Sequence, residues 1–480
     1  MRLHWHRADL RVTDNRGLAA AAGLPAADPA PGEGPAFGLF VLDGAVLDHA
    51  SPPRVAFLLD ALGALRDAYR ERGGDLCLRR GDPTAVLPAV VDEYDVSGVT
   101  WNRGYSGLAR ERDEAVRDAL DDTGVRVAAY HDALHHEPGS ITTNAGEPYS
   151  VYTYFWKKWR DREKAPPYPA PDEDDLVAPA DPGDLPDVTT LGFEQPTADL
   201  PPAGYEAARE RLDAFLAGDV YEYAERRDYP VDGCTSGLSA HLHYGTIGVR
   251  EVSAAVAEAR ADAPDEAARG SVDEFRSQLA WREFYHHVLR FNPEVVTENY
   301  REYAQAIGWR DDPERLEAWK RGETGYPIVD AGMRQLREEA YMHNRVRMIV
   351  ASFLTKDLLL DWRHGYAHFR ERLVDHDTAN DNGGWQWAAS TGTDAQPYFR
   401  IFNPMTQGER YDPAAEYIKR YVPELEGVNA DDIHSWHELS DGERERLAPD
   451  YPHPIVDHGE RREQALAMFK RARGEDPDED

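Results

Sequence analysis

The chain has 480 residues, of which 41% are hydrophobic, and its 88 acidic and 54 basic residues give a net charge of −34. This length predicts two or three domains with sizeable cores. The sequence has no apolar run near the ~20 residues of a membrane span, and its N-terminus lacks a signal-peptide core. Two cysteines, Cys77 and Cys234, exclude a disulfide scaffold and a cysteine metal cluster. We therefore expect a soluble, cytoplasmic monomer with no membrane partner.

Because the chain has only seven lysines, its positive charge is nearly all arginine. A surface poor in lysine and rich in acid indicates a salt-rich cytoplasm, where salt screens self-repulsion within a few Å. The net charge alone argues against nucleic acid as a partner. A local arginine cluster inside an acidic envelope would still allow one.

The first 130 residues alternate short apolar runs with amphipathic segments. The apolar runs predict strands at 3–6, 36–42, 76–78, 96–101 and 125–130, and helical periodicity predicts helices at 54–72, 84–93 and 108–121. This alternation predicts a doubly wound, parallel five-stranded α/β domain with ligands beyond the carboxyl ends of its strands. No glycine-rich fingerprint follows the first strand, so we expect no NAD site.

Residues 161–204 are rich in Pro and Asp, lack periodicity, and predict a linker that cannot fold alone. The remainder is almost entirely helical, with helices predicted at 205–217, 249–261, 271–290, 313–321, 327–341, 345–362, 365–373 and 459–473. We therefore divide the chain into an α/β domain at 1–135, an interdomain linker at 136–204 and an all-helical domain at 205–475.

The segment 375–404 (DHDTANDNGGWQWAASTGTDAQPYFRIFNP) is almost free of Val, Leu and Ile, yet it contains Trp385 and Trp387. We predict that it is neither an ordinary helix nor a core strand, because its polar groups need partners outside a hydrophobic interior. A long surface loop is the simplest alternative. Two tryptophans in three residues favour the wall of a ligand cavity.

Residues 234–242 (CTSGLSAHL) place three hydroxyls, on Thr235, Ser236 and Ser239, ahead of a short helix. Hydroxyl and backbone N–H groups at a helix start bind phosphate, although a plain N-cap would have the same sequence.

A second candidate face lies in the predicted helix 271–290. Gln278, Trp281, Arg282 and Tyr285 follow the spacing i, i+3, i+4, i+7 and therefore share one face, which suits a planar ligand with polar edges. The neighbouring His286-His287 pair has no further ligand at metal-binding spacing, so we expect no metal.

Asn344 and Met348 lie one helical turn apart, and Arg347 can pair with Asp375 or Asp377. That pair could serve a ligand or simply join two elements. Trp309, Trp362 and Trp385 lie on three separate elements and could each be a core anchor.

Together these motifs resemble the DNA photolyase/cryptochrome family over essentially the whole chain. The motifs are WHRADLR with Asp14-Asn15, TSGLS, WREFY, GYPIVDAGMRQL, MHNRVRM and DNGGWQWAASTGTDAQPYFRIFNP. The sequence is most similar to class I photolyases for cyclobutane pyrimidine dimers. The resemblance implies an α/β domain before an all-helical FAD-binding domain, and light-driven repair of pyrimidine dimers in DNA by an electron from reduced FAD.

The resemblance also assigns site residues. FAD binding would involve Tyr223, Thr235, Ser236, Gly237, Leu238, Ser239, Gln278, Arg282, Asn344, Arg347, Asp375, His376, Asp377 and Asp381. Binding of DNA and the flipped-out dimer would involve Arg227, Gln278, Trp281, Tyr285, Asn344, Arg345, Met348, Trp387, Arg400 and Gln407. Trp309, Trp362 and Trp385 match the family's electron-transfer chain.

Particular positions bear on the subtype. Asn344 and Met348 stand where photolyases for the (6-4) lesion carry histidines, which favours the cyclobutane dimer and makes a (6-4) photolyase the lesser alternative. Gln278 replaces the glutamate that is usual in dimer photolyases, which predicts weaker stabilisation of the dimer radical anion without loss of repair. Asp381 replaces an asparagine and matches plant cryptochromes, so a blue-light photoreceptor without repair activity is the alternative.

The resemblance implies a second, antenna chromophore. Leu108-Ala109 stands where folate-binding photolyases carry Asn-Glu. We therefore predict an 8-hydroxy-5-deazaflavin, with methenyltetrahydrofolate as the alternative.

Overall fold

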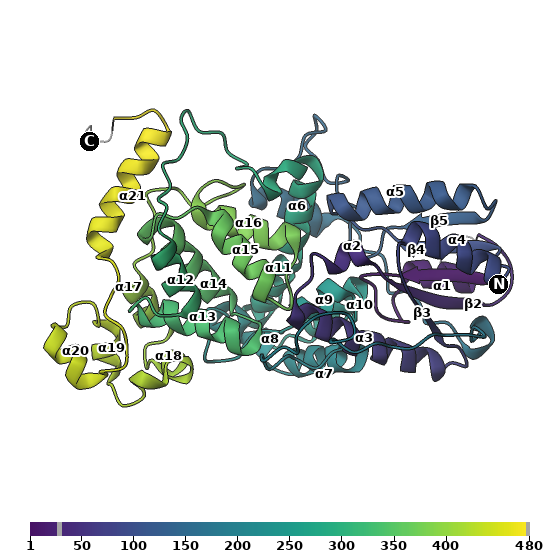
Figure 1. The fold of residues 1–480 in the computed structure, drawn as a ribbon, viewed down its shortest axis with the longest axis horizontal. Helices are drawn as coiled ribbons and strands as arrows, with labels where there is room; N and C mark the ends of the chain where they lie inside the picture. Colours follow the sequence, from purple (N-terminus) through teal and green to yellow (C-terminus); the bar gives the residue numbers. More distant parts are fainter. Residues whose placement is uncertain (26–30, 477–480) are drawn as a thin grey trace.

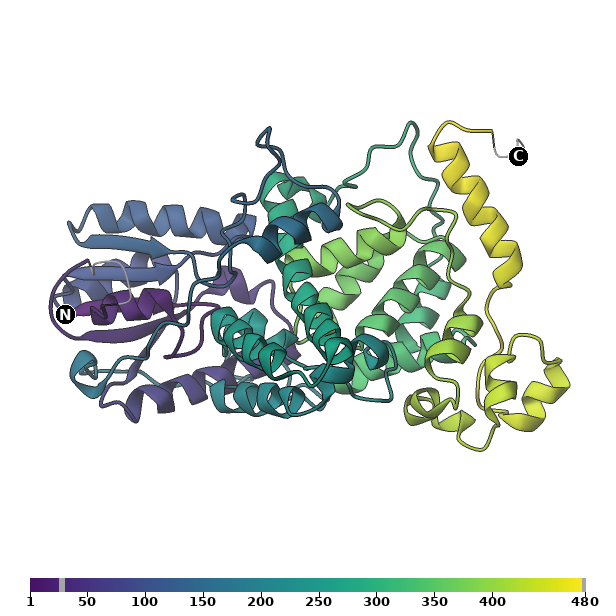
Figure 2. The same cartoon turned by 180° about the vertical axis from the view of Figure 1, so that it is seen from behind.

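The computed structural model describes residues 1–25 and 31–476. A parallel sheet with its helices lies at one end, and a larger body of helices at the other (Figure 1, and from behind in Figure 2). The strands are β1 (Arg2–His6), β2 (Ala36–Leu42), β3 (Leu76–Arg80), β4 (Gly98–Asn102) and β5 (Arg126–Tyr130). Their order is β3-β2-β1-β4-β5 and every pairing is parallel, which confirms the predicted five-stranded, doubly wound sheet.

Helices cover both faces of the sheet. They are α1 (Arg16–Ala22), α2 (Gly44–Leu47), α3 (Pro52–Arg70), α4 (Pro83–Glu93) and α5 (Gly107–Asp121). One hydrophobic cluster joins the sheet to α1 and α3, and a second joins it to α4 and α5. The three predicted helices are confirmed to within a few residues, whereas the short α1 and α2 were not predicted.

The segment 161–204 is mostly irregular, apart from η1 (Glu173–Asp175). Leu176, Val188 and Leu191 are buried in the cluster that α3 forms with the sheet, so this segment packs on the α/β part. Just before it lies α6 (Tyr152–Asp161), which was not predicted, although its buried residues Tyr152, Phe155 and Trp159 follow helical spacing.

The remaining chain forms the helical body, which contains no strand within the described residues. Its elements are α7 (Tyr205–Leu216), α8 (Asp219–Arg226), α9 (Ser239–Tyr244), α10 (Val249–Asp262), α11 (Glu266–Phe291), η2 (Pro293–Val296), α12 (Pro313–Arg321), α13 (Pro327–Glu339), α14 (Asn344–Ser352), η3 (Phe353–Asp357), α15 (Trp362–Arg372), α16 (Thr378–Ala389), α17 (Pro404–Tyr411), α18 (Glu416–Tyr421), η4 (Pro423–Leu425), α19 (Ala430–His434), α20 (Asp441–Leu447) and α21 (His458–Ala472). None of the helices described is long and apolar enough to cross a membrane.

Two predictions about this part were wrong. The helix expected at 345–362 is interrupted, because α14 passes into a π-helical turn, η3, and α15 starts only at Trp362, where Asp361 caps it. The segment 375–404, predicted not to be helical, contains α16. At the start of this helix the side chain of Asp377 accepts a hydrogen bond from Asn380 N. Polar side chains of the helix bond to neighbouring elements, as Asn382 does to Val295 O.

Buried ion pairs join the two parts. Arg250 on α10 donates to Asp14 at 2.6 Å and also pairs with Asp132, while Arg11 pairs with Asp132 at 2.5 Å. A charge buried without its partner is costly, so these pairs fix the helical body against the carboxyl end of the sheet.

Candidate functional site

The start of α16 carries a cluster of three carboxylates that face basic side chains from other elements. Arg347 on α14 donates to both carboxylate oxygens of Asp375, at 2.8 and 3.0 Å, and lies 3.6 Å from Asp381. Burial alone would lower the pKa of Arg347, but Asp375 and Asp381 raise it. The predicted contact between Arg347 and this segment therefore forms with Asp375, not Asp377.

Asp377 instead faces two histidines. Its Oδ2 lies 3.4 Å from His286 Nε2 and 3.8 Å from His243 Nδ1. Burial alone would raise the pKa of Asp377, yet the two histidines hold it well below its usual range. His376 pairs with Asp381 at 2.6 Å. Asp375, His376 and Asp381 thus share one buried ionic cluster with Arg347, whereas Asp377 pairs separately with two histidines of α9 and α11.

Arg282 lies on α11 and donates to two backbone carbonyls, Ala133 O at 2.9 Å and Leu242 O at 3.0 Å. It therefore joins the end of the α/β part to α9. Burial lowers the pKa of this guanidinium, and Asp377 opposes that shift.

The predicted phosphate loop runs into α9. Gly237 has φ +61°, a left-handed conformation that favours glycine, and a Cβ on it would lie 2.3 Å from Arg211 Nη1, the end of a flexible side chain. Leu238 is the N-cap of α9, and Ser239 its first residue. Tyr223 is buried on α8. A close approach of backbone, hydroxyls and arginine gives this loop the donors that a phosphate group requires.

The polar face predicted on α11 exists, but it is organised by residues that sequence analysis missed. Tyr152 stacks on Trp281 with ring centroids 3.7 Å apart and planes 9° apart. Glu274, one turn before Gln278, accepts the Gln278 side-chain amide at 3.1 Å and pairs with Arg227 at 2.6 Å. Glu274 precedes Gln278 by four residues, and this helical spacing could have indicated the contact from the sequence. Because the NH₂ group of Gln278 is bound to Glu274, its carbonyl oxygen is the atom left to face a ligand.

Two of the five predicted tryptophans are buried and three are partly exposed. Trp385 and Trp362 are fully buried in the main helical core, at 2% and 0% exposure, and Trp309 packs against the same core from the surface. Trp362 donates its indole N–H to Asn299 at 2.9 Å. Trp281 and Trp387 are partly exposed, as Trp309 is, and they pack against two different cores. Buried rings suit electron transfer, whereas half-exposed rings are available for stacking.

The remaining predicted contacts lie at or near the surface. The Asn344 amide and the Met348 sulfur are 3.8 Å apart. Arg345 pairs with Asp228 at 2.7 Å and lies over the Tyr411 ring, while Arg400 is exposed and Gln407 lies on α17. Tyr285 packs between Trp281 and α16. Two of the predicted DNA contacts, Arg227 and Arg345, therefore already hold carboxylate partners.

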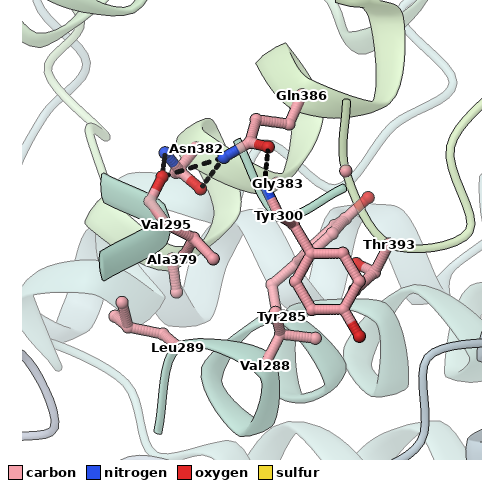
Figure 3. A pocket seen from close by; sticks show the side chains of 11 residues that line it. Tyr285, Val288, Leu289, Val295, Tyr300, Ala379, Asn382, Gly383, Gln386 and Thr393 are labelled. Carbon is pink, nitrogen blue, oxygen red and sulfur yellow. Dashed lines mark hydrogen bonds between the residues drawn. The ribbon is translucent and has the colours of Figure 1, made fainter. Parts of the chain in front are cut away.

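A small cavity between α11 and α16 shows how α16 is held (Figure 3). Gln386 accepts from Tyr300 N at 2.9 Å, and the amides of Gln386 and Asn382 both donate to Val295 O, at 2.8 and 2.7 Å (Figure 3). The cavity measures about 10 Å³, room for about one water. It is therefore a packing feature of α16 and not a ligand site.

A larger cavity lies at the carboxyl end of the sheet, where the sequence analysis predicted a ligand. It measures about 520 Å³ and is lined by Leu42, Asp43, Gly44, Ala45, Arg80, Gly81, Asp82, Pro83, Thr84, Leu108, Glu111, Arg112 and Ala115. Leu42 and Arg80 end β2 and β3, so the cavity opens at the carboxyl edge. Arg112 Nε is buried without a partner among the described residues, and burial lowers the pKa of this guanidinium to about 10.

Comparison with known proteins identifies the family. Residues 2–172 match the family described as DNA photolyase, and residues 275–471 match the FAD binding domain of DNA photolyase. The chain is 64% identical to a protein of Halobacterium salinarum named deoxyribodipyrimidine photo-lyase, over 99% of this chain and 100% of that protein. The chain therefore belongs to the DNA photolyase family and carries its FAD-binding domain.

Solved structures agree with that assignment. A class III photolyase from Agrobacterium tumefaciens has a TM-score of 0.89 and 37% identity, covering 98% of this chain and 97% of that one. An archaeal photolyase from Sulfolobus tokodaii, described with two FAD molecules, has a TM-score of 0.82 and 31% identity, covering 98% and 99%.

Proposed function

We propose that this protein repairs cyclobutane pyrimidine dimers in DNA in a light-driven reaction, as a deoxyribodipyrimidine photo-lyase. The placement of the tryptophans carries the proposal, because two half-exposed rings, Trp281 and Trp387, can stack on a dimer. Of the three proposed for electron transfer, Trp362 and Trp385 are buried in the helical core and Trp309 lies at its edge. The division into an α/β domain at 1–135, a linker at 136–204 and a catalytic helical domain at 205–475 is part of the proposal.

When bound in its reduced form, FAD supplies the light-excited electron that splits the cyclobutane ring. The residues of the chain fit this cofactor. The donors of the Thr235–Ser239 loop would hold its phosphates, and the paired Arg347 and Asp375 would present fixed polar groups to its ring. Gly237 places the backbone of this loop beside the Arg211 guanidinium, which could also bind a phosphate.

The residues around the dimer have separable tasks. A flipped-out dimer costs a few kcal/mol to extrude, and stacking worth about 1–3 kcal/mol per base on Trp281 and Trp387 offsets that cost. Tyr152 fixes the plane of the Trp281 ring by stacking on it. The Gln278 carbonyl would accept a hydrogen bond from a thymine N–H, as the usual glutamate would, but without its charge.

The photoreceptor alternative requires Asp381 to act as a proton donor. In the structure this carboxylate lies 2.6 Å from His376 and 3.6 Å from Arg347. These contacts support the role of a counter-ion, and we therefore favour repair.

For the antenna chromophore we propose 8-hydroxy-5-deazaflavin in the cavity at the carboxyl edge of the sheet. The cavity is lined by two guanidinium groups, on Arg80 and Arg112, and by three carboxylates, so a guanidinium would have to pair directly with the acidic hydroxyl of that ring system. The absorption spectrum of the native holoprotein distinguishes it from methenyltetrahydrofolate.

The decisive experiment illuminates the purified holoprotein with blue light in molar salt, together with an oligonucleotide that carries one thymine dimer. We expect the dimer to disappear in the light and persist in the dark. An unchanged dimer after illumination of the fully reduced protein would refute the function. Trp281→Ala should weaken binding of the dimer by about 1–3 kcal/mol.

A further inference from the structure

The end of α6 and the three residues after it carry an unusual concentration of positive charge. Residues 157–164 (KKWRDREK) contain five basic and two acidic residues in a chain with a net charge of −34. They also contain three of the seven lysines of the whole chain. A local reversal of charge on an acidic protein indicates an anionic partner at that place.

The two lysines of α6 lie on one solvent-facing stripe, whereas Arg160 lies outside it. Tyr154, Lys157, Lys158 and Asp161 follow the spacing i, i+3, i+4, i+7, and all four are exposed. The opposite face, with Phe155 and Trp159, is buried. The Lys157 ammonium lies 5.7 Å from the centre of the Tyr154 ring, which is 58% exposed. This stripe therefore offers two ammonium groups and a phenol ring to the same partner, while its one carboxylate, Asp161, is paired with Arg160.

Lys157 and Lys158 have no carboxylate within 4.0 Å in the part of the chain that the structure describes. Their neighbours differ, because Arg160 pairs with Asp161, and Lys164 donates to the Trp159, Arg160 and Arg162 carbonyls that end the helix. The predicted DNA contacts Arg227 and Arg345 are also occupied by carboxylates. An unpaired lysine can bind a phosphate without first losing an internal partner.

The anchoring of α6 places this stripe beside the lesion site. Tyr152 stacks on Trp281 and its hydroxyl donates to Ser277 O at 2.6 Å. Tyr152 N donates to Asp394 at 3.3 Å, in the segment that follows Trp387 on α16. The start of α6 thus contacts the elements of both stacking tryptophans, and Figure 1 shows α6 beside α11 and α16.

We propose that Lys157 and Lys158 bind phosphates of the DNA backbone next to the flipped-out dimer. They lie roughly 8 Å beyond Tyr152 along the helix axis, at 1.5 Å per residue, which corresponds to about two to three nucleotides along one strand. This inference rests on the proposed function, since it takes damaged DNA as the ligand. A structural alternative is that both lysines only stabilise the carboxyl end of α6 through the helix dipole.

The test measures the affinity of the holoprotein for a duplex with one thymine dimer at several KCl concentrations in which the protein stays folded. Each phosphate contact contributes about 0.9 to the slope of log affinity against log salt concentration. We expect Lys157→Ala/Lys158→Ala to reduce the magnitude of this slope by about 1–2 and to weaken binding several-fold at the lowest salt. Lys157→Arg/Lys158→Arg should keep the wild-type slope.

The matched control is Lys419→Ala/Arg420→Ala, which removes the same charge from α18. This helix lies across the molecule from α6 in Figure 1, so the control should leave the slope unchanged. Repair of a single-stranded dinucleotide dimer should be unaffected in all variants, because that substrate has no flanking phosphates. An unchanged slope in the alanine variant, with or without a loss of thermal stability, overturns the inference even if the wild-type protein repairs dimers. Failure of the wild-type protein to bind or repair any dimer would overturn the proposed function as well.

Discussion

Two adjacent glycines of α16 should respond in opposite ways to the same substitution. A Cβ on Gly383 would lie 2.2 Å from Tyr285 Cδ1 and 2.3 Å from its Cε1, far inside van der Waals contact. A Cβ on Gly384 would meet no described atom within 4 Å. Both residues lie inside the helix, where alanine is intrinsically better than glycine by about 0.5–1 kcal/mol.

For Gly384→Ala only the higher helix propensity of alanine applies, so the free energy of unfolding should rise by about 0.5–1 kcal/mol. For Gly383→Ala the Tyr285 ring must move by roughly 1 Å to restore contact. The cavity beside that ring measures about 10 Å³, which is too small to receive it. Overpacking costs about 1–3 kcal/mol, so after the helix gain Gly383→Ala should lose roughly 1–2 kcal/mol.

Denaturant unfolding of the two holoproteins at one fixed salt and FAD concentration measures both values. Gly383→Ala should also weaken dimer binding, because Tyr285 packs against Trp281 with ring centroids 5.6 Å apart. If Gly383→Ala proves as stable as Gly384→Ala, the packing argument is wrong and the glycine serves another purpose, such as the approach of the cofactor.

Three further predictions concern electron transfer, the lesion contact and pH. Trp385→Phe should abolish photoreduction of the bound flavin while dimer binding persists; normal photoreduction in this variant would exclude the buried tryptophans from electron transfer. Gln278→Glu alone should not speed repair, because the new carboxylate would face the carboxylate of Glu274, which now accepts from the amide at 3.1 Å. The double variant Gln278→Glu/Glu274→Gln should speed repair, since it removes that repulsion. Equal repair rates in the two variants would contradict this prediction. The free energy of unfolding should fall as pH drops from 6.5 toward 4. In the folded protein burial lowers the pKa of six histidines to about 3 or 4, so over this range the unfolded chain binds protons that the folded chain does not. An unchanged free energy of unfolding in denaturant titrations at pH 7, 6 and 5 would count against this prediction. These histidines are His4, His135, His136, His241, His343 and His368. Asp330 and Asp357, with a pKa raised to about 6 by burial, oppose the trend but are fewer.

Sequence patterns predicted the sheet well because each strand is a short apolar run between turn residues. They failed for α16, whose sequence has no apolar stripe. Asp377 caps this helix locally, but the helix also depends on tertiary contacts, namely the amides of Asn382 and Gln386 on Val295 O and the fit of Gly383 against Tyr285. Propensity and periodicity cannot register such contacts, since the partners lie more than eighty residues away in the chain.

The candidate site was predictable in part. Motif positions brought Asp375, His376, Asp381 and Arg347 into one cluster, as expected of residues that serve one ligand. The resemblance did not identify Glu274 or Tyr152, although each stands at a visible spacing, four residues before Gln278 and at the start of an aromatic run. What sequence could not supply is the partner of each polar atom, and that partner decides which atom of Gln278 faces the ligand.

The charge of the protein bears directly on how it can recognise DNA. Arg227 and Arg345 are held by carboxylates at 2.6 and 2.7 Å, so binding a phosphate there exchanges one ion pair for another. Near molar salt the screening length is about 3 Å, and long-range attraction cannot compensate for a net charge of −34. The gain must therefore come from contacts that salt does not screen. Stacking on Trp281 and Trp387, as proposed, is such a contact. The phosphate contacts proposed for Lys157 and Lys158 weaken as the salt concentration rises, so they add to binding mainly at lower salt.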